Sequence, residues 1–288
     1  MIDFLKFKIV YLIISTLVIS AGLFSIIKWG YQYSIDFTGG TNLVYQLNKK
    51  IDLVKLEKLL KDKKIKITNK QYSNNELSLK LSSIDEKQEL RFRQDLNKQF
   101  KLETKILKFE TVGPVIGQET LSKTLIASIL AITGILIYMS FAFKGFNYAF
   151  SAILAMIHDF LVVVGSYSLL SHFFGAELDT LFVTAVLTTM SFSVHDTIVI
   201  FDKIREYLKE EGKGNIEYYA NRALTETMVR SINNSMTIVF MLLALVLLGG
   251  TTIRFFSLTL LIGTITGTYS SPFIATPILV WLEKRRKK

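Results

Sequence analysis

The 288-residue chain has no cysteine and only three histidines, and it shows no internal repeat. Without cysteine it forms neither disulfides nor thiolate metal sites, so a domain outside a membrane depends on its own hydrophobic core. Its two glycine-bearing segments, at residues 35–41 and 112–119, are not set in the strand-to-helix loop that cradles phosphate. Disulfide scaffolds, thiolate metal centres and nucleotide sites are therefore not indicated.

Apolar residues are gathered in separate blocks. Half of the residues are hydrophobic, and six blocks reach the roughly 18 residues that cross about 30 Å of hydrocarbon as a helix. The blocks are residues 9–27, 121–143, 148–170, 180–201, 228–248 and 255–282. The first is longer than the roughly 7–15 apolar residues of a signal peptide, so we expect a retained anchor. The pattern predicts a polytopic α-helical membrane protein with six transmembrane helices.

The distribution of basic residues predicts the orientation. The net charge is +10, and much of it lies in connections on one side of the six-helix arrangement, so nucleic acid is not needed to explain it. The short loops on the other side, 172–179 and 249–254, carry a single arginine. Both termini are therefore expected in the cytoplasm. The lysine-rich insert between the first two spans is expected outside, because long domains translocate largely regardless of charge.

These considerations divide the chain into four parts. Residues 1–28 form a cytoplasmic N-terminus and the first transmembrane helix, and residues 29–120 form a periplasmic α+β domain. Residues 121–283 hold the other five helices, with a cytoplasmic loop at about 202–227, and residues 284–288 form a basic cytoplasmic tail.

The insert has the pattern of a small α+β domain. Strands are predicted over 41–47, 65–72, 76–81 and 104–112, and helices over 53–61 and 84–100. Ser83 and Glu86 are placed to form a capping box at the start of the second helix. The resulting βαββαβ order is that of a ferredoxin-like sandwich, a fold that fixes no function.

A carboxylate lies within the fourth predicted span. Asp196 is about 8 Å from the cytoplasmic end, and Thr189 and Ser193 share its helix face. A carboxylate at that depth costs several kcal/mol unless it is paired, protonated or hydrated, so it is a functional hypothesis by default. The stripe resembles a hydrated seam.

The fifth span offers a complementary polar face. By spacing, this face carries Arg230, Asn233, Asn234 and Thr237. We expect an ion relay in which Asp196 takes a proton or cation and Arg230 biases its charge state, since a cation a few ångströms away favours the ionised form. Two alternatives remain open: a static ion pair, or an arginine that only reaches to lipid phosphates.

Three further features belong to the spans. Asp159, in the third span beside His158, is either a relay group or a helix-packing hydrogen bond. His195 precedes Asp196 but points about 100° away, so a metal site would need other ligands and none is expected. His195 either bonds a neighbouring helix or joins the relay through a histidine-assisted proton path. Gly263 and Gly267 form a G-x-x-x-G run in the last span, which suits a close helix seam.

Four segments resemble the SecD/SecF family. They are residues 35–40 (IDFTGG), 112–117 (VGPVIG), 193–206 (SVHDTIVIFDKIRE) and 267–271 (GTYSS), in order and over essentially the whole chain. The resemblance implies half of an RND-type architecture, completed by SecD, with a periplasmic ferredoxin-like domain. It implies that Asp196 and Arg230 are the essential membrane carboxylate and arginine, and Asp159 matches a family segment. His195 stands where the family usually has asparagine, which leaves the coupling ion open.

The resemblance also implies a role and partners. SecDF would join SecYEG in the bacterial inner membrane and use the proton or sodium gradient to promote the late stages of export, with the preprotein on the periplasmic side. YajC is a further candidate partner. No enzyme activity or cofactor is implied, and the second acidic site would belong to SecD.

Three other readings compete with this one. A self-contained RND exporter needs two halves, and the chain has one. An intramembrane aspartyl protease would use two aspartates on neighbouring spans, but its Gly-x-Gly-Asp segment is missing. A purely structural scaffold would leave Asp196 and Arg230 as a static pair.

Overall fold

A computed structural model describes residues 3–62, 65–73, 75–143, 145–212 and 214–286. The chain divides into two compact units. The helical unit comprises Met1–Gln32 and Ile126–Lys288, and the α+β unit comprises Tyr33–Leu125. Residues 287 and 288 of the predicted basic tail lie outside the described residues.

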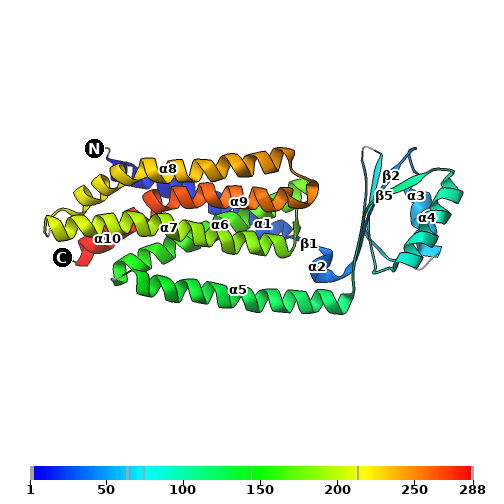
Figure 1. Ribbon diagram of the computed structural model, residues 1–288, viewed down its shortest axis with the longest axis horizontal. Coiled ribbons are helices and arrows are strands. Elements are labelled where there is room, and N and C mark those ends of the chain that lie inside the picture. The colour runs from blue at the N-terminus through cyan, green and yellow to red at the C-terminus, as the bar shows by residue number, and fades with distance from the viewer. Residues whose placement is uncertain (1–2, 63–64, 74, 144, 213, 287–288) are drawn as a thin grey trace. The chain divides into compact units, whose positions relative to one another are not determined.

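Long helices build the helical unit (Figure 1). In chain order the elements that contribute to it are η1 (Phe4–Phe7), α1 (Lys8–Trp29), β1 (Gln32–Tyr33), α5 (Pro114–Ala142), α6 (Phe146–Phe174), β6 (Glu177–Leu178), α7 (Thr180–Glu210), α8 (Ile216–Leu248), α9 (Thr251–Ser270), the π-helical segment η2 (Ser271–Ala275) and α10 (Thr276–Arg286). Helix α7 packs against α6, α8 and α9.

Five helices of the described chain are long and apolar enough to cross a membrane: η1 with α1, then α5, α6, α7 and α8. The predicted sixth span, 255–282, is divided among α9, η2 and α10. Pro272 lies in η2 and lacks the N–H of an ordinary helical hydrogen bond, which accounts for a local π turn there. Helices α7 and α8 continue well past the apolar blocks, so most of the predicted loop at 202–227 is helical.

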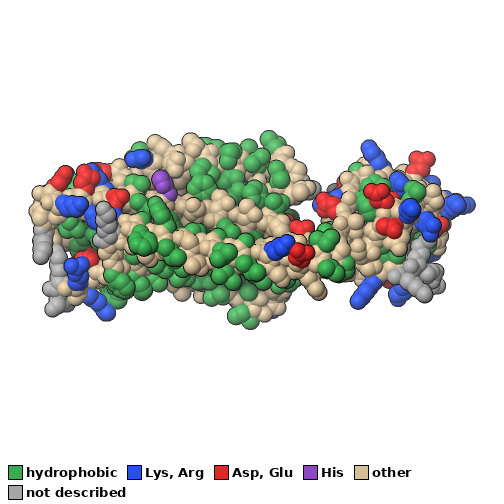
Figure 2. All heavy atoms as spheres, turned by 60° about the horizontal axis from the view of Figure 1, so that its bottom comes forward, with side chains coloured by type: hydrophobic (Ala, Val, Ile, Leu, Met, Phe, Trp, Pro, Cys, Tyr) green, Lys and Arg blue, Asp and Glu red, His purple; other side chains and the backbone are tan. Residues whose placement is uncertain are grey.

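Polar and apolar surface are separated along the helical unit. Figure 2 shows green apolar side chains over the middle of the unit and most of its visible Lys and Arg side chains at the left end. Both ends of the chain lie at that same end of the unit (Figure 1). Many apolar side chains point outward, among them Leu17, Ile129 and Phe240. A band of this kind suits contact with lipid.

The α+β unit contains one antiparallel sheet covered by helices. Its elements are α2 (Ile35–Thr38), β2 (Gly40–Leu47), α3 (Leu53–Asp62), β3 (Ile67–Ser73), β4 (Glu76–Leu81), α4 (Glu86–Phe100) and β5 (Thr104–Val112). The strands lie in the order β3-β4-β2-β5, and every neighbouring pair is antiparallel. Alternate residues of β2 and β4, such as Leu43 and Leu79, form a core with Phe92 and Leu96 of α4.

The start of α4 corrects one prediction. Asp85, not Ser83, caps the helix: its carboxylate accepts from the Gln88 N–H at 2.7 Å, and the Gln88 side chain accepts from the Asp85 N–H at 3.0 Å. Ser83 hydrogen-bonds to Thr111 at 3.2 Å instead. The predicted capping box was wrong by two residues because Asp85 offers the same chemistry nearer the first turn.

The two glycine-bearing segments meet within the α+β unit. Gly39 and Gly40 adopt φ of 68° and 123°, which only glycine adopts readily. A Cβ added at Gly39 would lie 2.7 Å from Cα of Pro114, and one at Gly117 would lie 2.7 Å from N of Gly39. Both segments therefore need glycine for close backbone approach, and the first also needs it for the turn.

Candidate functional site

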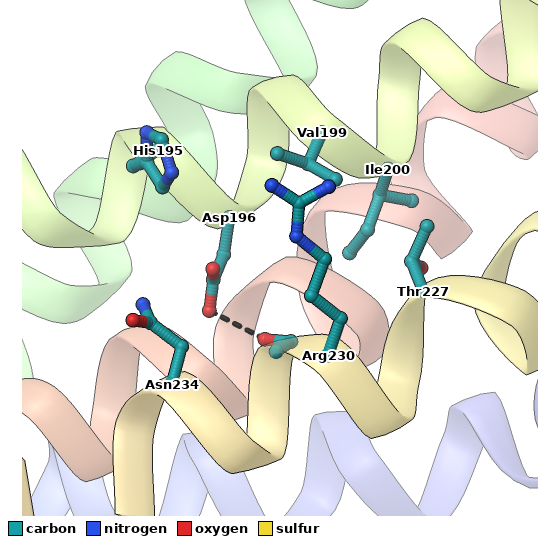
Figure 3. A pocket seen from close by; sticks show the side chains of 8 residues that line it. His195, Asp196, Val199, Ile200, Thr227, Arg230 and Asn234 are labelled. Atoms are coloured by element: carbon teal, nitrogen blue, oxygen red, sulfur yellow. Dashed lines mark hydrogen bonds between the residues drawn. The ribbon is translucent and has the colours of Figure 1, made fainter. Parts of the chain in front are cut away.

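Asp196 lies on α7 and faces α8. Its side chain is half-buried, and it accepts a hydrogen bond from the Ser231 hydroxyl of α8 at 2.6 Å (Figure 3). It opens onto a cavity of about 220 Å³ between the two helices. The cavity is lined by His195, Asp196, Val199, Ile200, Thr227, Arg230, Ser231 and Asn234. A space of this size has room for several water molecules.

Arg230 shares this cavity without pairing with the carboxylate. Among the described residues, no ion pair within 4.0 Å joins its guanidinium to Asp196. Figure 3 shows the Arg230 side chain reaching across the cavity toward Val199. Asp196 is hydrogen-bonded to Ser231 instead. A cation near an unpaired carboxylate can favour its charged form and still leave room for another ion.

The rest of the predicted polar face on α8 is spread around the helix. Asn234 lines the cavity beside Asp196. Asn233 and Thr237 are exposed and do not line it, and the Thr237 hydroxyl bonds to the backbone carbonyl of Asn234 at 2.7 Å. Of the two asparagines on the predicted polar face, Asn234 therefore lines the cavity and Asn233 does not.

Asp159, on α6, is the more deeply buried carboxylate, with 3% of its surface exposed. The Ser193 hydroxyl of α7 donates to its Oδ2, and the Ser270 hydroxyl of α9 donates to the same atom at 2.6 Å. Nδ1 of His158 lies 2.8 Å from its Oδ1. One carboxylate therefore joins three helices in the interior of the unit.

A smaller cavity of about 30 Å³ lies beside Asp196 and is lined by residues of α7, α8 and α9. Ser193, Asp196 and Thr264 all line it, and Oγ1 of Thr264 is buried without a hydrogen-bond partner among the described residues. The space suffices for a water molecule that would satisfy this hydroxyl. The seam between α7 and α9 is therefore polar as well as tightly packed.

Gly263 and Gly267 of α9 lie along this seam. A Cβ added at Gly263 would collide with the side chain of Thr189, and one at Gly267 would lie 3.1 Å from Cα of Ser193. Thr189 is buried, and its hydroxyl bonds to the backbone carbonyl of Val186. Close approach at these glycines places the Ser270 hydroxyl within reach of Asp159.

His195 has a different position from Asp196. Its side chain is exposed on the described chain, although the residue lines both cavities. Within the described residues, no group of three His, Asp or Glu side chains could hold a metal ion. His195 is therefore placed beside the Asp196 cavity rather than in a ligand cluster.

Several site residues were not among those predicted. Ser231 bonds Asp196, Ser270 bonds Asp159, and two hydroxyl pairs join α7 or α8 to the last span: Thr197 with Ser271 at 2.8 Å, and Ser235 with Thr268 at 2.6 Å. The run of hydroxyl residues at 264–271 was the available signal for the last span. Ser231 carried none, because one serine beside an arginine is common at a helix surface.

Comparison with known protein families shows which family the chain belongs to. The family model for "Protein export membrane protein SecD/SecF, C-terminal" matches residues 92–285, and the model for the "SecD/SecF GG Motif" matches residues 32–51. The chain belongs to the SecD/SecF family. The glycine pair of the second model is Gly39-Gly40, whose positive φ angles and contact with Pro114 give it a structural reason in this fold.

Relatives in this family align over nearly the full length. The chain is 39% identical to the protein translocase subunit SecF of Thermobaculum terrenum, over 99% of this chain and 95% of that protein. It is 38% identical to the SecF of Anaerolinea thermophila, over 97% of this chain and 94% of that protein. The translocase subunit SecDF of Thermus thermophilus is 33% identical over 90% of this chain, which spans only 35% of that protein.

Solved structures agree. The crystal structure of SecDF from Thermus thermophilus, described as a translocon-associated membrane protein, superposes with a TM-score of 0.81 at 29% identity. The match covers 99% of this chain and 39% of that one. A crystal structure of SecDF in a super-membrane-facing form gives a TM-score of 0.68 at 30% identity. The chain therefore corresponds to about two fifths of a longer SecDF chain.

Proposed function

We propose that this chain is a subunit of the bacterial protein-export machinery that, together with SecD, couples an ion gradient to late stages of export. The observation that carries the proposal is the half-buried Asp196, which opens onto a polar cavity beside an unpaired Arg230. Such a carboxylate can bind and release a proton or sodium ion. A site of this kind on a subunit of an export family suits energy coupling better than hydrolysis.

The proposal includes an arrangement of the chain in the membrane. Segments α9, η2 and α10 together form the sixth span, both termini lie in the cytoplasm, and the α+β unit is a ferredoxin-like domain in the periplasm. The strand order β3-β4-β2-β5 supports the ferredoxin-like assignment, because βαββαβ chains of that fold pair their strands in this order. Basic side chains at the end of the helical unit that holds both termini support the orientation. The membrane is the bacterial inner membrane.

In the proposed relay, a different role belongs to each of Asp196, Ser231 and Arg230. Asp196 takes the ion, and Ser231 supplies a hydrogen bond that favours the empty, charged carboxylate. Arg230 stabilises the same charge without occupying the carboxylate. Asp159, enclosed by hydroxyls, and His195, at the mouth of the cavity, are the remaining relay residues. The coupling ion is H⁺ or Na⁺, and no cofactor or nucleotide is required.

The chain is expected to work inside a larger assembly. Its relative in Thermus thermophilus carries the matching segment within a longer SecDF chain, which supports association with a separate SecD. SecYEG is the proposed channel partner, with YajC as a further candidate. The translocating preprotein would be met by the α+β unit on the periplasmic side.

An intramembrane protease is disfavoured by the contacts of the two aspartates. Such enzymes need both carboxylates at one water molecule. Here Asp159 is held by Ser193 and Ser270, and Asp196 is held by Ser231, so the two carboxylates have separate partners.

The proposal is tested by gradient-dependent preprotein export in cells that carry Asp196→Asn. Asparagine keeps the size of the side chain but cannot ionise, so we expect export to lose its dependence on the gradient. Asp202→Asn is the matched control, because Asp202 is an exposed aspartate of the same helix that pairs with Arg205. Normal gradient-dependent export by an Asp196→Asn chain that assembles with SecD would refute the relay.

A further inference from the structure

A histidine and an aspartate form a buried pair within α6. His158 is 8% exposed and Asp159 is 3% exposed, and Nδ1 of the ring lies 2.8 Å from Oδ1 of the carboxylate. The other ring nitrogen, Nε2, is buried and has no hydrogen-bond partner among the described residues. A buried polar atom without a partner costs free energy, so its presence calls for an explanation.

The donors around Asp159 favour one proton arrangement of the pair. Ser193 and Ser270 both donate to Oδ2, and the simplest state places an N–H on Nδ1 of His158 that donates to Oδ1. Asp159 is then ionised and the imidazole is neutral. In that tautomer Nε2 carries a lone pair and no proton.

The charge of the pair then makes it a base. An ionised Asp159 beside a neutral His158 has a net charge of −1 in an interior that disfavours charge. No Lys or Arg of the described residues lies within 4.0 Å of this carboxylate. A proton on Nε2 turns the pair into an imidazolium and a carboxylate with no net charge. Proton uptake therefore relieves an electrostatic cost that the surrounding hydroxyls offset only in part.

We propose that the His158–Asp159 pair is a proton-binding site inside the helical unit, distinct from Asp196, and that Nε2 of His158 is the atom that takes the proton. The step is a simple transfer: a proton leaves a water or hydronium donor and joins the Nε2 lone pair, and no other bond changes. Proton binding by this pair does not depend on the proposed function. Only the role of that proton in coupling rests on it.

The neighbours of the pair suit this role. Among the described residues, the titratable side chain of another element that faces the His158 ring is Tyr269 of α9, with ring centroids 6.3 Å apart. Its hydroxyl donates to the carbonyl of Tyr11 at 3.0 Å, so it does not occupy Nε2. On the other side, Ser193 bonds Asp159 and also lines the small cavity that Asp196 shares. Ser193 thus links the pair to the small cavity that Asp196 also lines.

Histidine-selective nitrogen NMR tests the site directly. The full chain, labelled with ¹⁵N-histidine and assembled with SecD in lipid vesicles, gives signals from only three histidines, and His172→Asn and His195→Asn assign the other two. We expect His158 to show a protonated Nδ1 and a bare Nε2 at high pH, and to become doubly protonated as the pH falls. In Asp159→Asn the protonation midpoint should fall by at least about one pH unit, a tenfold loss of proton affinity.

Two results would overturn the site: a ring of His158 that carries its proton on Nε2 at high pH, or one that stays neutral down to about pH 4. Flux measurements in the same vesicles then decide whether the site serves coupling. His158→Asn keeps an amide donor for Asp159 but removes the base, so gradient-driven flux should fall at least tenfold. Ser168→Ala is the control, because it removes a buried hydroxyl of the same helix that bonds Ser25 instead.

The outcomes separate the two proposals. If Asp196→Asn abolishes flux while His158→Asn leaves it normal, the relay at Asp196 stands and the coupling role of His158 is lost. If Asp196→Asn leaves flux normal, the proposed function fails, and the titration of His158 still decides whether the buried pair binds a proton.

Discussion

Serine hydroxyls partner the two aspartates that the sequence places within predicted spans. Asp196 is bound by Ser231, and Asp159 by Ser193 and Ser270. A hydrogen bond to a charged group contributes about 1.5–3 kcal/mol, whereas taking a charge out of water costs several kcal/mol even after relaxation. The hydroxyls position the carboxylates without cancelling their charge. In the proposed relay both positions therefore stay able to take an ion, which a permanent salt bridge would prevent.

A buried tyrosine in the α+β unit leads to a pH prediction. Tyr45 is fully buried and donates to Oε1 of Glu89 at 2.6 Å, and Arg93 lies 3.4 Å from that same oxygen. Burial, and then the hydrogen bond to Glu89, raises the pKa of Tyr45 well above its usual value. Its stabilising effect is therefore complete below about pH 10, the unfolded pKa, and is lost as the pH rises above it.

Tyr45→Phe should accordingly lower the stability of the α+β unit by about 1.5–3 kcal/mol at pH 7. The difference from wild type should shrink near pH 11, where the unfolded tyrosine ionises and the folded one does not. Urea midpoints of the unit, read by pulse proteolysis of the full-length protein at both pH values, measure this. A difference between the two proteins that stays constant with pH would contradict the buried neutral phenol.

At the scale of elements, one helix crossing depends on two glycines. A Cβ added at Gly165 of α6 would lie 2.7 Å from Cα of Gly22 in α1, and the reverse also holds. Beside this contact Ser25 and Ser168 share a hydrogen bond of 2.8 Å. Backbone meets backbone here, so neither helix can relieve the clash by turning a side chain.

Gly165→Ala should therefore destabilise the helical unit by about 1–3 kcal/mol, the usual cost of overpacking. Gly134→Ala on α5 is the matched control, because a Cβ there meets nothing within 4 Å. Alanine favours a helix over glycine by up to about 1 kcal/mol, so this control should be neutral or slightly stabilising. Thermal unfolding midpoints in detergent compare the two variants, and equal midpoints would refute the role of the crossing.

The elements themselves were largely predictable, and their contacts were not. Strands β2, β4 and β5 lie within one residue of their predicted ranges, since period-2 alternation and turn residues mark them. The cap of α4 was misplaced because Ser83 and Asp85 carry the same capping chemistry. The predicted last span is interrupted by a π segment at Pro272, which a hydropathy pattern does not reveal. Sequence spacing defines a helix face but not the neighbour that this face meets.

The same limit explains the site. Asp196, Arg230 and Asp159 could be found from the sequence because charged residues are rare and costly in apolar spans. Their partners could not, because serine is tolerated in many helix positions. Ser231 and Ser270 gain meaning only when α8 and α9 are packed against α7 and α6.

At the scale of the whole molecule, the proposed orientation can be tested by single cysteines. The chain has none of its own, so any maleimide label reports the introduced position alone. Lys87→Cys, exposed on α4, should react in intact spheroplasts with a membrane-impermeant maleimide. Lys209→Cys, exposed near the end of α7, should react only after the membrane is opened. The reverse pattern of labelling would place the α+β unit in the cytoplasm and overturn the orientation.

The central claim is that Asp196 carries the coupling ion. Its most direct test is gradient-driven flux in vesicles that hold the assembled complex, with one arm driven by a pH gradient and the other by a sodium gradient. We expect the wild-type complex to conduct the ion in at least one arm. The flux through Asp196→Asn complexes should be at least about tenfold lower, which corresponds to a barrier increase of about 1.4 kcal/mol. Assembled Asp196→Asn complexes that conduct as wild type does would contradict the account.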